Sequence, residues 1–455
     1  MVATRTDIDA LLDRALDHST AAQTEALYLG QDAALTRFAN NQIHQSVREH
    51  DGTLQIRVID GERIGVASTN RLDADGIRSV VERALAIAER SAPNPPAAIL
   101  PEPDGRQQDP QLGYVAATAE AEAVRRAEGA RAVIAAGETV GLQTAGSFST
   151  SVMTVAVANT RGIRVQHQST RAALLTVMMD GFASGAASGY AHAGSPDVGE
   201  IDAEALGAEA ARKGDEMRGA GELDAGEYEV ILEEYAVAGL LEYLSYIGFS
   251  GLAHEEGRSF MDLGARVMGD NVSIWDDGAD PSGLPAAIDF EGVVRKRVDL
   301  IERGIATSVV HDAATGARAG TGSTGHGLPA PNLIGPMASN LFMAPGTTPR
   351  DELIAGVERG VWVTRFHYIN PVHPKKAILT GMTKDGTFLI EDGKLTRPLL
   401  NFRFTQSIPE AFSDVRAASS STRLLPGEFI GGYRVPALHL GAFNFTGVTA
   451  TEGGA

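Results

Sequence analysis

The first 220 residues switch between two hydrophobic periods, one typical of helices and one typical of strands. Apolar residues recur at helical spacing from Thr6 to Leu16, which predicts a surface helix. From Ala26 to Ser68 the period becomes that of strands, and Asp60-Gly61-Glu62 between two strand-like runs predicts a hairpin. Further helices are expected at about 73–88, 115–136 and 202–217, and further strands at 151–159, 163–168 and 172–179.

The pattern becomes richer in strands after Gly219-Ala220-Gly221, which is the best candidate for a domain boundary. The helix expected at Ala236–Ile247 is too apolar to lie on the surface. Farther along, short strand-like runs recur between turns such as Lys384-Asp385-Gly386 and Glu391-Asp392-Gly393. One amphipathic helix is expected to interrupt them, from Thr348 to Gly360.

Together these patterns predict an α+β protein with two domains. The first is an N-terminal domain of mixed sheet and helix, residues 1–220, and the second is a strand-rich C-terminal domain, residues 225–455. A chain of 455 residues is long enough for two or three domains, so the length agrees with this division.

The composition excludes several classes of function. With 58 acidic and 39 basic residues the formal charge is −19, which argues against nucleic acid or an anionic membrane as the main partner. The chain has no cysteine, so disulfides, thiolate catalysis and Cys-ligated zinc are excluded. Acidic residues within the first helix disfavour a signal peptide, and no run of about eighteen apolar residues predicts a membrane span. We therefore expect a cytoplasmic protein.

Two motifs could carry chemistry but have simpler interpretations. Gly320 to Gly325 matches GxGxxG, yet His326 and two prolines follow it instead of a helix, which favours a glycine-rich connection over a nucleotide loop. None of the 11 histidines form a pair at the i, i+4 spacing that binds zinc on one helix face. His367 and His373 flank Asn370-Pro371 and could converge in a loop.

One acidic residue, Glu242, is expected inside the most apolar helix of the chain. A buried carboxylate needs either a partner or a raised pKa, so Glu242 is a weak candidate for a catalytic residue. The simpler hypothesis is a structural carboxylate that pairs with a nearby arginine or faces a polar cleft.

The second half of the chain resembles the TldD/PmbA family. The resemblance rests on several runs whose order and spacing hold from about Gly226 to Gly447. These runs are Glu291-Gly292-Val293, Asn340 to Gly346, Asp351 to Ile354, Gly360 to Thr364 and Phe388 to Pro398. Each run is unspecific alone, and their shared order makes the resemblance convincing.

The resemblance implies a role in proteolysis. One subunit type of this family carries HExxxH on a buried helix, with a later cysteine as a further zinc ligand. Here Leu241 and Tyr246 occupy the two His positions and only Glu242 remains, so the resemblance implies no zinc in this chain. The runs Gly257 to Met261 and Ser273 to Asp277 look like the PmbA (TldE) branch, which lacks the metal motif and pairs with a zinc-bearing TldD-type subunit.

Three hypotheses follow from this resemblance and from the residues. The first is a metal-free subunit of a TldD/TldE-type heterodimer, inactive as a peptidase without its HExxxH-bearing partner, that helps to bind unfolded or precursor peptides. The second is a non-enzymatic homodimer that binds peptides or another protein. The third is a peptidase whose unusual metal site is built from His326, His367, His373 or acidic residues.

Overall fold

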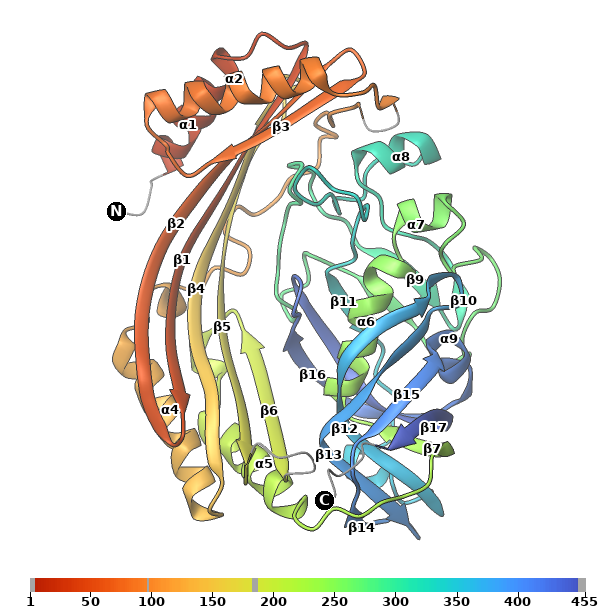
Figure 1. Cartoon of the computed structure of the whole chain (residues 1–455). Helices are drawn as coiled ribbons and strands as arrows, with labels where there is room; N and C mark the ends of the chain where they lie inside the picture. The colour runs from red at the N-terminus through yellow and green to blue at the C-terminus, as the bar shows by residue number, and fades with distance from the viewer. Residues whose placement is uncertain (1–4, 96–97, 182–186, 449–455) are drawn as a thin grey trace, which may run out of the picture.

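The structure is a computed structural model that describes residues 5–95, 98–181 and 187–448. Its first half forms a long, curved antiparallel sheet that lies beside a strand-rich second half (Figure 1). In the described residues this sheet has six strands in the order β3-β2-β1-β4-β5-β6. Their bounds are Gln23–Ala39 for β1, Gln42–Asp60 for β2, Arg63–Thr69 for β3, Gln143–Asn159 for β4, Arg164–Met179 for β5 and Ser188–Ser195 for β6.

Helices cover one face of this sheet and the C-terminal half covers the other. Helices α1 (Arg5–Asp17) and α2 (Ala74–Arg90) pack on one end of the sheet, and α4 (Ala123–Thr139) and α5 (Ala203–Glu216) pack on the other. Alternate strand residues point to opposite faces, so Leu174 contacts the helical layer while its neighbour Leu175 packs against the C-terminal core.

The C-terminal half is a closed barrel with additions. Strands β17, β15, β13, β12 and β7 pair in that order, and β7 also pairs with β17, which closes the ring. The barrel strands are β7 (Gly226–Leu232), β12 (Arg359–His373), β13 (Ile378–Glu391), β15 (Phe402–Ser407) and β17 (Gly432–Val448). Helix α6 (Glu234–Ile247) follows β7 directly and packs against β12 and β17. The α+β fold with a strand-rich second half is confirmed.

The remaining elements extend or cover the barrel. The sheet continues beyond β17 in the order β11, β8, β9 and β10, while β14 pairs with β13 and β16 pairs with β17. Their bounds are Ile274–Asp276 for β8, Val298–Glu302 for β9, Ile305–Ala306 for β10, Asn340–Met343 for β11, Lys394–Pro398 for β14 and Val415–Pro426 for β16. Three short helices are α7 (Gly251–Glu255), α8 (Ala313–Ala319) and α9 (Ile408–Ala411). Among the described residues, none of the helices has the length and hydrophobicity needed to cross a membrane.

The prediction of an amphipathic helix at Thr348–Gly360 is wrong. Only a single 3-10 turn forms there, at Arg350–Glu352, and β12 begins at Arg359. Gly356 weakens a helix at this place, and Leu353 and Val357 are buried against Trp362 of β12 instead. Pairing of β12 with β7 therefore outweighs the helical period.

The long helix expected at 115–136 is divided in two. Helix α3 (Ala116–Ala119) ends before α4 begins at Ala123. The Thr118 hydroxyl donates to the Pro196 carbonyl, and the Val198 amide donates to Thr118. These tertiary hydrogen bonds hold the first turn away from the axis of α4.

Two turns expected in the second half also need correction. Lys384-Asp385-Gly386 lies inside β13, where Asp385 (φ 56°) and Gly386 (φ 135°) make an irregularity in the strand. His367 and His373 lie on β12 and not in a loop, because β12 continues to pair with β13 beyond Asn370.

A buried ion-pair cluster links the long sheet to the C-terminal half. Arg57 of β2 lies 2.7 Å from Glu25 and 3.0 Å from Glu291, and Glu291 also accepts the Ala313 amide at the start of α8. Burial raises the pKa of Glu291 most strongly, Arg57 opposes this rise, and the charges of Asp289 and Glu25 add to it.

The raised pKa of Glu291 predicts that stability falls as the pH rises above about 4.5, its ordinary value. The folded protein holds a proton that the unfolded chain releases, so a higher pH favours unfolding until the folded carboxyl also ionises. Thermal melts between pH 5.5 and 8.5 measure this slope, and Glu291→Gln should reduce it. An equal slope in the variant would contradict the assignment.

Candidate functional site

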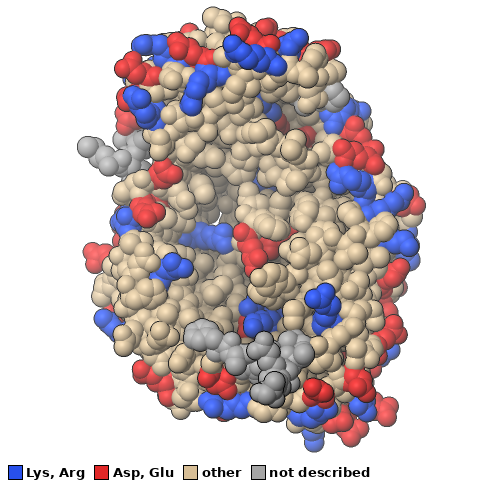
Figure 2. Space-filling model, in the orientation of Figure 1, with Lys and Arg blue, Asp and Glu red and all other residues tan. Residues whose placement is uncertain are grey.

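A cavity of about 560 Å³ lies between the two halves of the chain. The side toward the N-terminal half is lined by Leu175 of β5 and by Tyr190 and His192 of β6. The opposite side is formed by α6, by residues 365–370 of β12 and by the segment 425–428. Figure 2 shows a hollow in the middle of the molecule, with a basic side chain and an acidic one facing each other across it.

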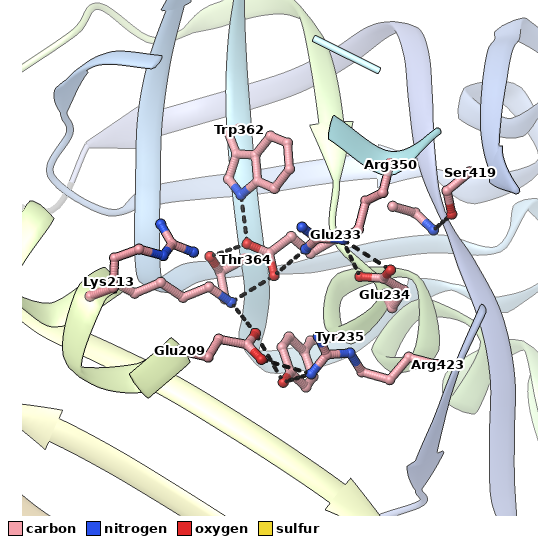
Figure 3. Close-up of polar contacts among 12 residues, drawn as sticks. Glu209, Lys213, Glu233, Glu234, Tyr235, Arg350, Trp362, Thr364, Ser419 and Arg423 are labelled. Carbon is pink, nitrogen blue, oxygen red and sulfur yellow. Dashed lines mark hydrogen bonds and ion pairs between the residues drawn. The ribbon is translucent and has the colours of Figure 1, made fainter. Parts of the chain in front are cut away.

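Next to this cavity, a buried charged network connects α5 to the start of α6 (Figure 3). The Lys213 ammonium lies 2.7 Å from Glu209 and 2.7 Å from Glu233, and its side chain is only 2% exposed. Glu233 also accepts hydrogen bonds from Trp362 (2.6 Å) and Thr364 (3.0 Å) of β12. Burial opposes ionisation of Glu233, but Lys213 and Arg350 outweigh it and lower its pKa to about 2.

Two arginines complete the network. Arg350 lies 3.2 Å from Glu233 and 3.1 Å from Glu234, and Arg423 lies 2.9 Å from Glu209. These ion pairs join Lys213, Arg350 and Arg423 to Glu209, Glu233 and Glu234, so their charges cancel inside a poorly solvated region. It fixes the N-terminus of α6 and so fixes the side chains that this helix presents to the cavity.

Glu242 is one of the side chains that α6 presents to the cavity. Its side chain lines the cavity, is 5% exposed and accepts a 2.8 Å hydrogen bond from the Phe429 amide. Burial raises the pKa of Glu242, and the nearby charge of Glu428 raises it further. Tyr246 lies one turn later and packs against Tyr243 and Phe429, with ring centroids 6.0 Å from each.

The three positions that correspond to the metal helix do not converge. Leu241 is fully buried in the hydrophobic core, whereas Glu242 faces the cavity. Burial and the charges of Tyr243 and Glu242 raise the pKa of Tyr246 to about 12, so its phenol stays neutral and is a poor ligand.

The three candidate histidines also lie apart. His367 lines the cavity, and burial and the charge of Arg365 lower its pKa. His373 is exposed at the end of β12, where it accepts the Lys376 amide at 3.4 Å. His326 is buried elsewhere, 2.8 Å from Thr324 and 2.8 Å from Asp276. Within the ranges that the structure describes, no group of three or more His, Asp or Glu side chains could hold a metal. The residues present do not fit zinc.

The glycine-rich segment 320–325 has a different place from that of a nucleotide loop. Gly320 (φ 70°) ends helix α8, so the segment follows a helix instead of opening one. Its last residues lead to Thr324 and His326, whose side chains make buried hydrogen bonds. The geometry agrees with a structural connection.

Several residues of the cavity could not be recognised in the sequence. Arg365 lies 2.6 Å from Asp385, which also accepts the Ser188 hydroxyl, and its guanidinium stacks 4.4 Å from the Tyr190 ring centroid. Tyr433 is buried beside Glu242, although nearly two hundred residues separate them. The glycine that follows Asp385 indicates a turn-like backbone at this position, in agreement with its positive φ. The contacts of these residues between the two halves of the chain have no local feature in the sequence.

Comparison with protein families gives matches along most of the chain. The model described as PmbA/TldA metallopeptidase domain 1 matches residues 28–88, and the central domain matches residues 112–218. The PmbA/TldA metallopeptidase C-terminal domain matches residues 225–447.

Individual relatives are distant. A metalloprotease of Methanothermobacter thermautotrophicus is 25% identical over 58% of this chain and 60% of its own length. A second archaeal metalloprotease, from Methanocaldococcus jannaschii, is 28% identical over 44% of this chain and 45% of its own length. The metalloprotease PmbA homolog of Haemophilus influenzae is 23% identical over 81% of each chain. The chain thus aligns with less than two thirds of both archaeal relatives.

Two solved structures share the fold. TldE from Thermococcus kodakarensis superposes with a TM-score of 0.85, 20% identity, and coverage of 97% of this chain and 100% of that one. A Thermotoga maritima protein described as a candidate modulator of a DNA gyrase superposes with a TM-score of 0.84, 17% identity, and coverage of 96% and 100%.

Proposed function

Because this chain belongs to the PmbA/TldD metallopeptidase family, we propose that it is the metal-free subunit of a two-subunit peptidase. A TldD-like partner with HExxxH would supply the zinc and the hydrolytic step. The observation that carries this proposal is the chemistry of α6, where Leu241 has no donor atom and Tyr246 remains protonated. A cytoplasmic location is part of the proposal and rests on the sequence features given above.

We propose further that the chain binds its substrate as an extended peptide. Among the described residues, strand β6 pairs with β5 alone, and its residues Tyr190 and His192 line the cavity. The His192 amide donates to the Tyr235 hydroxyl of α6 (3.2 Å) and not to β5, so it points to the side of the strand away from β5. A peptide added along such an edge gains main-chain hydrogen bonds with little demand on its sequence.

The first test of this proposal is the zinc content of the purified chain. Elemental analysis after purification without chelators should find far less than one equivalent of zinc, because α6 offers no ligand set. A TldD-like partner purified in the same way is the positive control. One tightly held equivalent of zinc in this chain would contradict the assignment.

A further inference from the structure

Two carboxylates share the cavity, and neither forms an ion pair with any residue in the described ranges. One oxygen of Glu242 accepts a hydrogen bond from the Phe429 amide. Glu428, the residue before Phe429, lines the same cavity. Both carboxylates act on Tyr243: burial raises its pKa most, and the negative charges of Glu428 and Glu242 raise it further. Arg365, the arginine that lines the cavity, is already paired with Asp385. No cation in the described ranges therefore contacts either carboxylate, although the charge of Arg171 acts on Glu242.

Aromatic rings surround these carboxylates. Tyr190, Tyr243 and Tyr433 line the same cavity as Glu242 and Glu428. The Tyr433 side chain is 1% exposed, and burial together with the adjacent Glu242 carboxylate raises the pKa of its hydroxyl. The phenol therefore lies beside the Glu242 carboxylate, and a cation bound there would also contact the tyrosine.

At the rim of the cavity the backbone turns one more aromatic side chain outward. Tyr368 has a φ of 52°, which is unusual for a residue other than glycine. It lies where the pairing of β12 with β13 shifts register between His367 and Asn370. Such an irregularity redirects a side chain, and Tyr368 is 74% exposed while still lining the cavity.

We propose that this cavity binds the cationic group of a peptide, an ammonium or a guanidinium, between Glu242 and Glu428 and against the surrounding aromatic rings. This inference rests on the proposed function, because it names the chemistry of the peptide that the subunit holds. Carboxylates and aromatic faces both attract an organic cation, and the attraction is strongest where water is excluded. Two carboxylates alone are too few protein ligands for a tightly held metal ion, so an organic cation fits the site better.

A nearby cation, Arg171, should have the opposite effect on ligand binding to that of Glu242. Arg171 lies on the face of β5 that is turned toward the C-terminal half, and it makes no hydrogen bond or ion pair with any described residue. Burial lowers the pKa of Arg171, and the charge of Glu242 opposes that effect. The two side chains therefore interact electrostatically without forming an ion pair. A ligand cation at Glu242 would be repelled by Arg171.

The test measures how tightly peptides compete with a fluorescent eight-residue peptide for the purified chain. Three unlabelled competitors share one sequence: one carries a lysine and an acetylated N-terminus, one carries acetyl-lysine and a free N-terminus, and one carries both blocking groups. The doubly blocked peptide should bind at least about tenfold more weakly than a cationic one. Restored binding with the lysine identifies a side-chain cation as the ligand, and restored binding with the free N-terminus identifies the terminal ammonium.

Variants of the chain separate this inference from a merely structural role for Glu242. Glu242→Gln should remove the preference for cationic peptides, whereas Arg171→Gln should strengthen it. The matched control is Glu128→Gln, which removes one negative charge from the exposed side of α4 and should change nothing. Equal binding of all three peptides would overturn the inference while leaving the proposed function intact. If no peptide binds the chain alone or with its zinc-bearing partner, the proposed function fails as well.

Discussion

Replacing Lys213 with methionine should lower the free energy of unfolding by about 3–5 kcal/mol, the usual cost of removing one partner from a buried ion pair. The ammonium of Lys213 is the group that joins Glu209 and Glu233 at 2.7 Å each. Methionine fills a similar space but leaves Glu233, whose side chain is 1% exposed, paired with the more distant Arg350. Urea denaturation followed by circular dichroism measures this loss.

Two further variants show whether the loss comes from the unpaired charge. Arg212→Met removes a cation from the same helix, but Arg212 pairs with Glu216 at the surface, so it should cost no more than about 0.5 kcal/mol. The double variant Lys213→Met/Glu233→Gln removes both charges and should recover part of the stability lost by Lys213→Met alone. Equal losses for Lys213→Met and Arg212→Met would show that the network does not hold the two halves together.

The spacing of apolar residues predicted a helix correctly where the tertiary contacts of the segment also favour a helix. The helices at α1, α2 and α5 were predicted from their apolar spacing, and the Asp73 and Asp202 side chains cap α2 and α5. The segment 348–360 has the same kind of period and is not a helix. Its apolar residues are buried against β12, and the sequence contains no local sign of that contact.

The sequence indicated a residue of the candidate site only where a charged residue lies within an otherwise apolar segment. Glu242 was recognised because an acid within an apolar helix needs an explanation, and it does line the cavity. Lys213, Arg365 and Tyr433 look ordinary in the sequence, because each has a partner outside its own helix or strand, Glu233, Asp385 and Glu242 respectively. His326 shows the converse: it looked like a candidate ligand, but it is buried in a hydrogen-bonded structural position.

Adding a zinc-bearing TldD-like subunit should raise peptidase activity from background by at least about two orders of magnitude, the range that metal activation and a general base supply. The chain alone should hydrolyse nothing, because α6 provides no zinc ligands. Its contribution would be to hold the peptide at β6 and the cavity while the partner hydrolyses it. The substrate should be an unstructured peptide with at least one lysine, so that both proposed contacts can form.

The most direct measurement of this division of labour compares peptide hydrolysis by the chain, by the partner and by the mixed pair at equal concentrations, with and without a chelator. We predict activity only in the mixed pair, lost with the chelator and lost when the HExxxH glutamate of the partner is replaced by glutamine. Chelator-sensitive hydrolysis by this chain alone at the rate of the pair would contradict the account. Peptide binding by a homodimer of this chain, with no hydrolysis in any mixture, would favour a binding module instead of a peptidase subunit.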